Sequence, residues 1–165
     1  MEPKRVIIYT DGSSLGNPGP GGYGAVLHYG SHTKELSGGF RCTTNNRMEV
    51  LAAIEALKSL TQPCHVTLHT DSQYLVNAVS KGWAKRWQAN AWMRNKRERA
   101  INPDLWEQLL MLLKTHQVEF VWVRGHAGNA GNERCDHLAK GAAEQPDLPP
   151  DPGYQGTCQD VLQLK

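Results

Sequence analysis

The sequence predicts a mixed α/β fold: a five-stranded sheet, antiparallel in strands 1–3 and parallel in strands 4–5, flanked by helices on both faces. Three observations lead to this class. Five short runs are rich in β-branched residues and read as strands. The first three are separated by glycine-containing turns, which is typical of an antiparallel meander. The last two each follow helical sequence, as parallel crossovers require.

Each element follows from its local pattern. The expected strands are "RVIIYT" (5–10), "YGAVLHYG" (23–30), "HTKELSGGF" (32–40), "CHVTLHT" (64–70) and "VEFVWV" (118–123). Helices are expected over residues 47–60, 72–80, 103–113 and 132–143. Asn102 is the expected N-cap of the third helix, because proline is favoured at the first helical position.

The chain has 165 residues, the size of one ordinary domain. We place that domain at residues 1–143 and expect a flexible tail over 144–165, because "EQPDLPPDPGYQGTCQD" carries four prolines and little apolar content. The four cysteines show no C-x-x-C spacing and are expected to be reduced thiols. No apolar run is long enough for a membrane span, and no secretion signal is recognised. We therefore expect a cytoplasmic protein, and a monomer by default.

Charge is distributed unevenly along the chain. The net charge is only +2, yet the segment Lys81–Arg99 contains seven basic residues and one acid. The remainder is therefore acidic. This asymmetry predicts a polyanionic partner that touches one region of the surface.

A Thr-Asp pair ends two of the expected strands, in "VIIYTDGSS" (6–14) and "VTLHTDSQYLV" (66–76). Taken singly, Asp71 is explained as an N-cap of the following helix, and Asp11 as the residue that opens a turn. If the two strands are parallel neighbours, however, both carboxylates lie at one sheet edge. Active sites of open α/β sheets lie outside such an edge.

Two further acids lie on helices that could reach the same edge. Glu49 falls on the alanine-rich, inward-facing stripe of its helix, opposite Lys58, and a buried glutamate is costly unless it is paired or binds a metal. Asp136 lies early in the last helix. Favourable interaction with the helix dipole is the simpler explanation of each acid. Gathered together, the four carboxylates would favour Mg²⁺, which prefers oxygen ligands.

Several motifs in one order resemble the type 1 ribonuclease H family, to which the bacterial ribonucleases HI belong. They are "TDGSSLGNPGPGGYGAVL", "TTNNRMEVLAAIEAL", "TDSQYLVNAV" and "WVRGHAGNAGNERCDHLA", and the similarity runs from about Lys4 to Ala143. The resemblance implies a ribonuclease H-like fold and hydrolysis of the RNA strand of RNA–DNA hybrids. It further implies two-metal-ion cleavage that leaves 5′-phosphate and 3′-hydroxyl ends, with Mg²⁺ or alternatively Mn²⁺ as cofactor.

The resemblance also assigns the catalytic residues. Asp11, Glu49, Asp71 and Asp136 match the metal-binding acids of the family. His126 matches a mobile histidine that assists proton transfer or product departure, a role suited to a side chain that changes charge near neutral pH.

Substrate-binding residues are assigned in the same way. The positions that match the groove of the family are Asn17, Thr44, Asn45, Asn46 and Gln73, and those in its basic protrusion, here residues 81–99, are Trp83, Arg86 and Trp87. Amide and hydroxyl groups suit recognition of 2′-hydroxyls without sequence reading. Turn and cap chemistry is the alternative role for the first group, and anchoring of the protrusion is the alternative for the tryptophans.

The protrusion departs from the family pattern. Arg86 stands where relatives often have asparagine, and "QANA" precedes Trp92 in place of a basic run. Two other functions stay open: a hybrid-binding module without catalysis and a structure-specific DNA nuclease. The presence of all four acids and of His126 favours the enzyme over the binding module.

Overall fold

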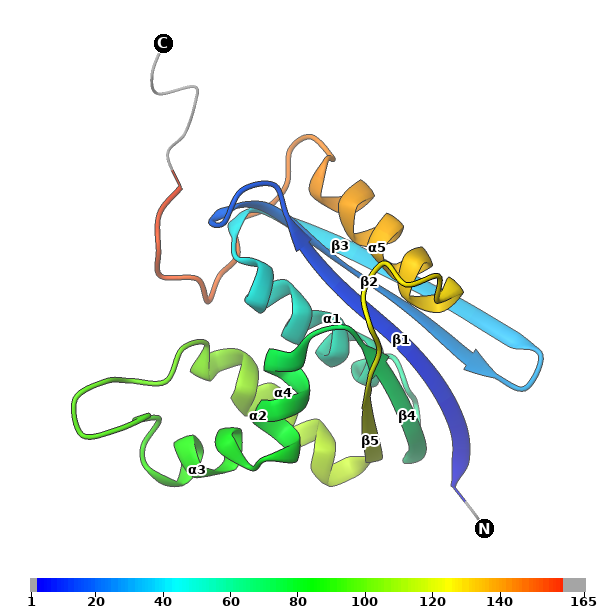
Figure 1. The fold of residues 1–165 in the computed structure, drawn as a ribbon, viewed down its shortest axis with the longest axis horizontal. Coiled ribbons are helices and arrows are strands. Elements are labelled where there is room, and N and C mark those ends of the chain that lie inside the picture. The colour runs from blue at the N-terminus through cyan, green and yellow to red at the C-terminus, as the bar shows by residue number, and fades with distance from the viewer. Residues whose placement is uncertain (1–2, 159–165) are drawn as a thin grey trace.

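The computed structural model describes residues 3–158 and contains a five-stranded sheet in the order β3-β2-β1-β4-β5 (Figure 1). The strands are β1 (Lys4–Ser14), β2 (Gly19–Tyr29), β3 (His32–Thr43), β4 (Cys64–Thr70) and β5 (Gln117–Trp122). The helices are α1 (Asn45–Lys58), α2 (Gln73–Ser80), α3 (Trp83–Ala89), α4 (Pro103–Thr115) and α5 (Ala130–Ala143). The expected fold class is confirmed.

The sheet has one antiparallel and one parallel half. β1 pairs with β2, and β2 with β3, in antiparallel register, whereas β4 pairs in parallel with both β1 and β5. The parallel pairing of β1 and β4 ends with Thr10 opposite Thr70. β1 then continues to Ser14 against β2 alone. The expected strand was too short here, because "GSS" is typical of a turn but pairs with Tyr23, Gly22 and Gly21 of β2.

Helices cover both faces of the sheet (Figure 1). α5 packs against β1, β2 and β3 on one face. α1 packs against the same three strands on the other face, and α4 packs against α1. The largest fully buried side chains, among them Trp106, Met48 and Ile54, lie in this second layer. Within residues 3–158, no helix is long and apolar enough to cross a membrane.

α2 leads into the expected protrusion, which consists of α3 and the loop that follows it and extends from the body at the lower left of Figure 1. Gly82 connects the two helices with a φ of 73°, a conformation that glycine adopts without a steric penalty. Trp83 and Trp87 are partly buried, and Trp87 contacts Trp106 of α4 edge to face, with ring centroids 6.1 Å apart. The tryptophans therefore anchor the protrusion to the body.

The segment after α5, which the sequence predicts as a flexible tail, makes contacts with the body. Residues 146–158, which we call the strap, run back along the end of the sheet (Figure 1). The backbone N–H of Arg41 donates to the carbonyl of Pro149, and the Asp151 carboxylate accepts from Arg47 and Thr43. Proline-rich composition indicated disorder, but it does not reveal these long-range polar contacts. The last seven expected tail residues, 159–165, lie outside the described part of the chain.

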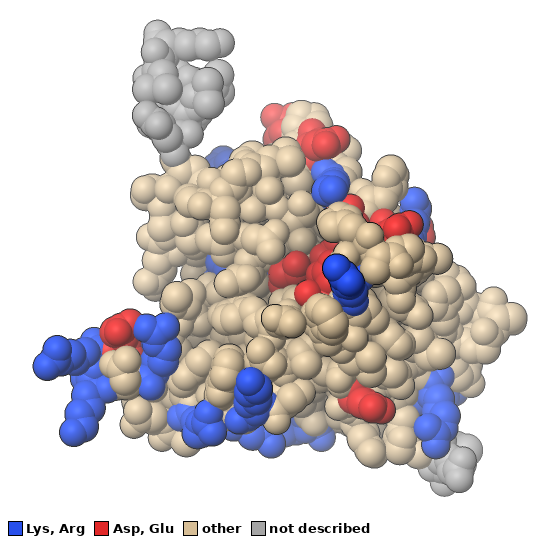
Figure 2. All heavy atoms as spheres, viewed as in Figure 1, with Lys and Arg blue, Asp and Glu red and all other residues tan. Residues whose placement is uncertain are grey.

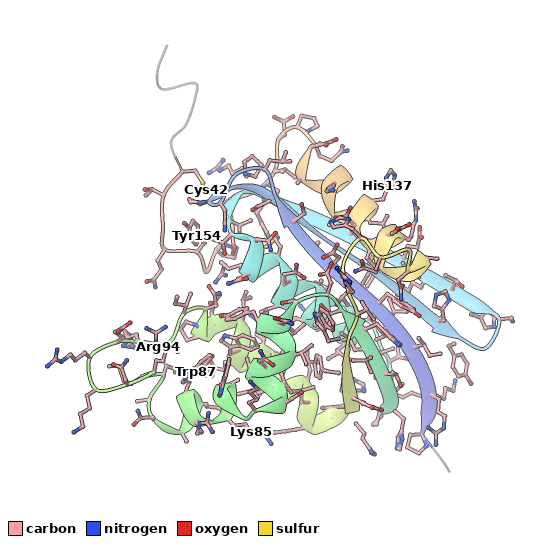
Figure 3. All side chains as sticks on the ribbon, in the orientation of Figure 1. Cys42, Lys85, Trp87, Arg94, His137 and Tyr154 are labelled. Carbon is pink, nitrogen blue, oxygen red and sulfur yellow. A yellow bond between two sulfur atoms is a disulfide. The ribbon has the colours of Figure 1, made fainter. Side chains whose placement is uncertain are left out.

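The expectation that all four cysteines are reduced is also wrong. Cys42, in β3, forms a disulfide with Cys158 of the strap, with the two Cα atoms 5.8 Å apart (Figure 3). The two residues are 116 positions apart in sequence, so no local spacing revealed the pair. Cys64 and Cys135 are free and buried, as expected.

The disulfide closes a long loop, and its removal is expected to destabilise the fold. The double variant Cys42→Ser/Cys158→Ser should lose about 2–4 kcal/mol in free energy of unfolding, because the unfolded chain regains loop entropy. Urea unfolding with and without a reductant measures this loss. Reductant should shift the wild-type midpoint and leave that of the double variant unchanged. A wild-type urea midpoint that does not change when reductant is added would contradict the disulfide.

Candidate active site

Three carboxylates meet at the edge where the parallel strands end. Asp11 and Asp71 directly follow the paired residues Thr10 and Thr70. Glu49 comes from α1, which packs against β1. Each of the three acids offers one carboxylate oxygen that lies within 4.8 Å of those of the other two. The predicted convergence of Asp11, Asp71 and Glu49 is thus present in the structure.

Gly12 allows α1 to approach β1 closely. A Cβ atom at this position would overlap the backbone nitrogen of Glu49 and the carbonyl carbon of Met48. Any larger residue would therefore push the start of α1 away from the strand. The glycine after the first Thr-Asp pair thus brings Glu49 within reach of Asp11.

Asp71 is not the N-cap of the following helix. α2 begins at Gln73, and the Ser72 hydroxyl accepts the capping hydrogen bond from the Leu75 N–H at 3.1 Å. The simpler explanation of Asp71 therefore does not hold, and its carboxylate is free to serve the acidic centre. The Asn132 side chain donates to Asp71 Oδ2 at 3.2 Å and orients it.

Burial and mutual repulsion raise the proton affinity of the centre. Burial, followed by the nearby charge of Asp71, raises the pKa of Asp11 to about 8, although the Gly12 N–H donates to Asp11 Oδ1 at 2.9 Å. Burial and the charges of Asp11 and Asp71 likewise raise the pKa of Glu49 well above its usual value. Without a cation, the centre therefore retains protons near neutral pH.

The chemistry of the centre fits a hard divalent cation. All three groups are carboxylates, the ligands that Mg²⁺ and Mn²⁺ prefer. Glu49 is 6% exposed, and within residues 3–158 its Oε2 has no hydrogen-bond partner. A buried oxygen without a partner is costly unless a cation or proton satisfies it. Figure 2 shows acidic side chains gathered in a hollow near the middle of this face.

Asp136 and His126 lie at the periphery. Asp136, on α5, forms an ion pair with Lys140 at 3.0 Å, and its charge contributes to the raised pKa of Asp11. It is not one of the three converging ligands, and its role in metal binding stays a prediction. His126 is exposed in the loop after β5, with a φ of 56°. Gly125, beside it, packs so closely on Asp71 that a Cβ atom would lie 2.8 Å from Oδ2.

Four of the five predicted groove residues lie at the start of α1, and the fifth, Gln73, begins α2. Thr44 caps the helix by accepting from the Arg47 N–H at 3.2 Å, and Asn17 Oδ1 accepts from the Asn45 N–H at 3.1 Å. Cap and turn roles are therefore present, as the alternative expected. Asn17, Asn46 and Gln73 are nevertheless exposed, so their side chains are accessible to a ligand.

A cavity of about 790 Å³ joins this region to the protrusion. Its lining residues include Asn46 from α1, Tyr74 from α2, and Trp83, Arg86 and Trp87 from α3. Basic side chains gather on the protrusion at the lower left of Figure 2, and Figure 3 labels two of them, Lys85 and Arg94, of which Arg94 also lines the cavity. The cavity combines aromatic and cationic groups, which suits a nucleic-acid strand.

The comparisons with known proteins agree with this geometry. The RNase H family model matches residues 3–144. The chain belongs to the RNase H family. It is 68% identical over 151 residues to the ribonuclease H of Syntrophus aciditrophicus (strain SB), and the aligned region covers 92% of this chain and 87% of that protein. It is 63% identical over 153 residues to the ribonuclease H of Rippkaea orientalis, covering 93% and 94% respectively.

Solved structures of RNase H proteins share the fold. LC9-RNase H1, described as a type 1 RNase H with the type 2 active-site motif, superposes with a TM-score of 0.77 at 34% identity, over 87% of this chain and 74% of that chain. LC11-RNase H1, solved in complex with an RNA/DNA hybrid, gives a TM-score of 0.64 at 26% identity, over 84% and 96%. The ribonuclease H fold, the family and the enzyme class expected from the motifs are confirmed.

Sequence reasoning missed three residues that support this RNase H site. Asn132, 2% exposed, lies inside the recognised "NERCDHLA" motif, but its bond to Asp71 depends on how α5 packs. Arg47, on the outer side of α1, lies inside the recognised "TTNNRMEVLAAIEAL" motif, but no role was predicted for it. The strap, through Asp151, and α4 cover it there. No signal in the local sequence reports such coverage.

The raised pKa of Asp11 predicts a pH dependence of the metal-free protein. Its folded pKa of about 8 lies above the ordinary value of 3.8, so between these values the folded state holds a proton that the unfolded state has lost. Stability should therefore fall as pH rises from about 4 to about 8. Asp11→Asn should weaken this slope and stabilise the protein by roughly 1–3 kcal/mol at about pH 8.5.

Urea unfolding in the presence of a chelator, at several pH values, measures both effects. Excess Mg²⁺ should restore wild-type stability at high pH, because bound cations neutralise the carboxylates. Glu49 retains its own contribution, so the Asp11→Asn slope should be reduced rather than zero. Equal slopes for the two proteins would contradict the assignment.

Proposed function

We propose that this RNase H protein is an endonuclease that hydrolyses the RNA strand of RNA–DNA hybrids and leaves 5′-phosphate and 3′-hydroxyl ends. The single observation that carries the proposal is the position of the Asp11–Glu49–Asp71 centre beside a groove that leads to the basic protrusion. The acidic centre supplies oxygen ligands for metal-assisted phosphodiester chemistry, and the groove with the protrusion contacts a polyanion. The RNA/DNA hybrid bound to LC11-RNase H1 supports the same substrate.

The proposed cofactor is Mg²⁺, with Mn²⁺ as the alternative ion. Asp11, Glu49 and Asp71 would hold it, and we keep Asp136 as a further ligand that the second of two ions would recruit from its pair with Lys140. When bound, such ions lower the pKa of an attacking water and stabilise the leaving oxygen of an in-line displacement. Asn132 meanwhile keeps Asp71 in the orientation that the centre needs.

The remaining residues bind and orient the substrate. Asn17, Asn46 and Gln73 are exposed amides around the centre and suit hydrogen bonding to the hybrid across its minor groove. Trp83, Arg86 and Trp87 line the cavity in which we place the DNA strand. Trp92 and the outer basic residues complete the protrusion, although Arg94 is paired with Glu98.

His126 is the proposed proton carrier. It lies in an exposed loop whose Gly125 packs against Asp71, so the loop adjoins the acidic centre. Histidine exchanges protons near neutral pH and can protonate a departing oxygen.

A hybrid-binding module without catalysis is the weaker alternative. A module of that kind has no need for a buried carboxylate such as Glu49, whose Oε2 lacks a partner within the described residues. We propose that the enzyme acts in the cytoplasm, where bacterial RNA–DNA hybrids arise, and that it works as a monomer, because the centre and its groove are built from one chain.

Asp71→Asn should abolish cleavage and leave hybrid binding largely intact. The substitution removes a metal ligand at a strand end but little packing, and kcat should fall by at least about 10³-fold. Single-turnover cleavage and binding in the presence of a chelator measure the two effects. Glu119→Gln, which removes an exposed carboxylate from β5, is the control and should retain wild-type rates. Near wild-type cutting by Asp71→Asn would refute the metal assignment.

The direct test of the function is a cleavage assay on labelled RNA paired to DNA. The same RNA single-stranded, an all-DNA duplex and a chelator in place of Mg²⁺ serve as controls. Metal-dependent cutting of the hybrid alone, with 5′-phosphate products, is the expected result. Tight hybrid binding without cutting under either metal would favour the binding module, and cutting of the DNA duplex would favour a structure-specific DNA nuclease.

A further inference from the structure

The start of α1 is fixed from its outer side by a buried guanidinium group. Arg47 is 2% exposed, and its side chain makes five hydrogen bonds. Nε and one terminal nitrogen donate to the Asp151 carboxylate at 2.7 and 3.1 Å. The terminal nitrogens also donate to the two oxygens of Asp104 at 2.9 and 2.8 Å, and one of them donates to Asn102 Oδ1 at 3.2 Å.

Asp151 connects this guanidinium to the end of β3. Its Oδ2 accepts from the Thr43 hydroxyl at 2.7 Å, and its Oδ1 accepts from the Gly153 N–H at 3.3 Å. Burial alone would raise the pKa of Asp151, but the hydrogen bonds from Arg47 and Thr43 outweigh it and hold the pKa below its usual value. The carboxylate is therefore charged at neutral pH and joins β3, α1 and the strap.

The cluster is connected both to the acidic centre and to the cavity. Arg47 stands directly after Asn46, which lines the cavity, and two residues before Glu49 of the acidic centre. Asn102 and Asp104 lie at the start of α4, immediately after the protrusion loop. Asn102 also donates to the Tyr74 hydroxyl, at 3.5 Å, and Tyr74 lines the same cavity.

Asn102 itself shows that the cluster takes priority over local capping. The sequence predicted it as the N-cap of α4, yet its φ is 62° and its side chain makes no capping hydrogen bond. That side chain instead accepts from Arg47 and donates to Tyr74. The expected cap is thus replaced by a link between α1, α2 and the start of α4.

A buried ion cluster is weak evidence for stability, because desolvation offsets much of the attraction and apolar residues can often replace it. Directional hydrogen bonds supply something else, a fixed geometry between the elements that they join. Here those elements are the helix that carries Glu49 and Asn46, the helix that follows the protrusion, and the strap.

We propose that Asp151 is a positioning residue for hybrid binding: through Arg47 it sets the spacing between the acidic centre and the protrusion. The strap, tied at its far end by the Cys42–Cys158 disulfide, thereby acts on substrate affinity without touching substrate. The inference rests on the proposed function and names a determinant of its KM.

The sign of the expected effect separates positioning from simple electrostatics. Asp151→Asn removes a negative charge, which on charge alone should strengthen binding of a polyanion. Loss of the fixed spacing should do the opposite. We expect the KM for a labelled hybrid, and its Kd in the presence of a chelator, to rise about tenfold, with kcat within about twofold of wild type.

Two further variants complete the test. Asp147→Asn removes the same charge from an exposed position in the strap and should leave KM unchanged or slightly lower. Thr43→Val keeps the shape of a fully buried residue but removes one donor to Asp151, and it should raise KM about twofold to threefold. If Asp151→Asn fails to fold, Thr43→Val still tests the proposal, because it weakens the same cluster. All measurements are made well below the thermal transition of each variant.

The outcomes are distinguishable. Raised KM and Kd for Asp151→Asn and Thr43→Val, beside a normal Asp147→Asn, support the proposal. Lower melting temperatures with unchanged KM and Kd overturn it and leave a structural role only. A fall in kcat at constant KM also overturns it, because the cluster would then act on the acids. Failure of the proposed function itself would show as a wild-type protein that neither binds nor cuts the hybrid.

Discussion

Repulsion among three carboxylates at one sheet edge is the interaction on which the rest of this structure depends. The parallel register of β1 and β4 makes Asp11 and Asp71 neighbours, and Gly12 lets α1 bring Glu49 to them. Within residues 3–158, none of these three carboxylates forms an ion pair with a lysine or arginine, and Lys140 pairs with Asp136 instead. The chain thus assembles a negative centre and leaves its neutralisation to protons or to a metal ion, which makes binding at this edge sensitive to pH.

Such a centre requires a scaffold that does not relax away from it. The inner side of α1 is held by apolar packing, with Met48 and Ile54 fully buried. Its outer side is held by Arg47, which is bonded to α4 and the strap. Apolar packing alone is tolerant of small shifts, whereas five directed hydrogen bonds are not. The two kinds of contact together explain how one helix presents both an acid of the centre and the predicted groove residues.

The features that were predictable from sequence are those encoded locally or in repeated motifs. β-branched runs predicted the strands, and helical sequence before β4 and β5 predicted the parallel half of the sheet. The repeated Thr-Asp pair predicted that Asp11 and Asp71 lie at one sheet edge. Helical periodicity correctly placed Glu49 inward. No role was predicted for Arg47, because periodicity within one helix does not reveal the strap that covers its outer side. Cys158 and Asp151 find partners more than a hundred residues away, and composition carries no trace of such pairing.

The charge pattern implies that substrate and metal bind interdependently. A phosphate at the acidic edge is repelled until a cation is present, whereas the protrusion attracts the same polyanion at a distance from that edge. In the proposed function, a hybrid held by the protrusion would supply phosphate oxygens as further ligands for an ion that Asp11, Glu49 and Asp71 would hold. Because such coupling is reciprocal, the ion must in turn tighten the hybrid. The coupling acts only if both binding regions keep a fixed separation, and the described contacts that span them converge on Arg47.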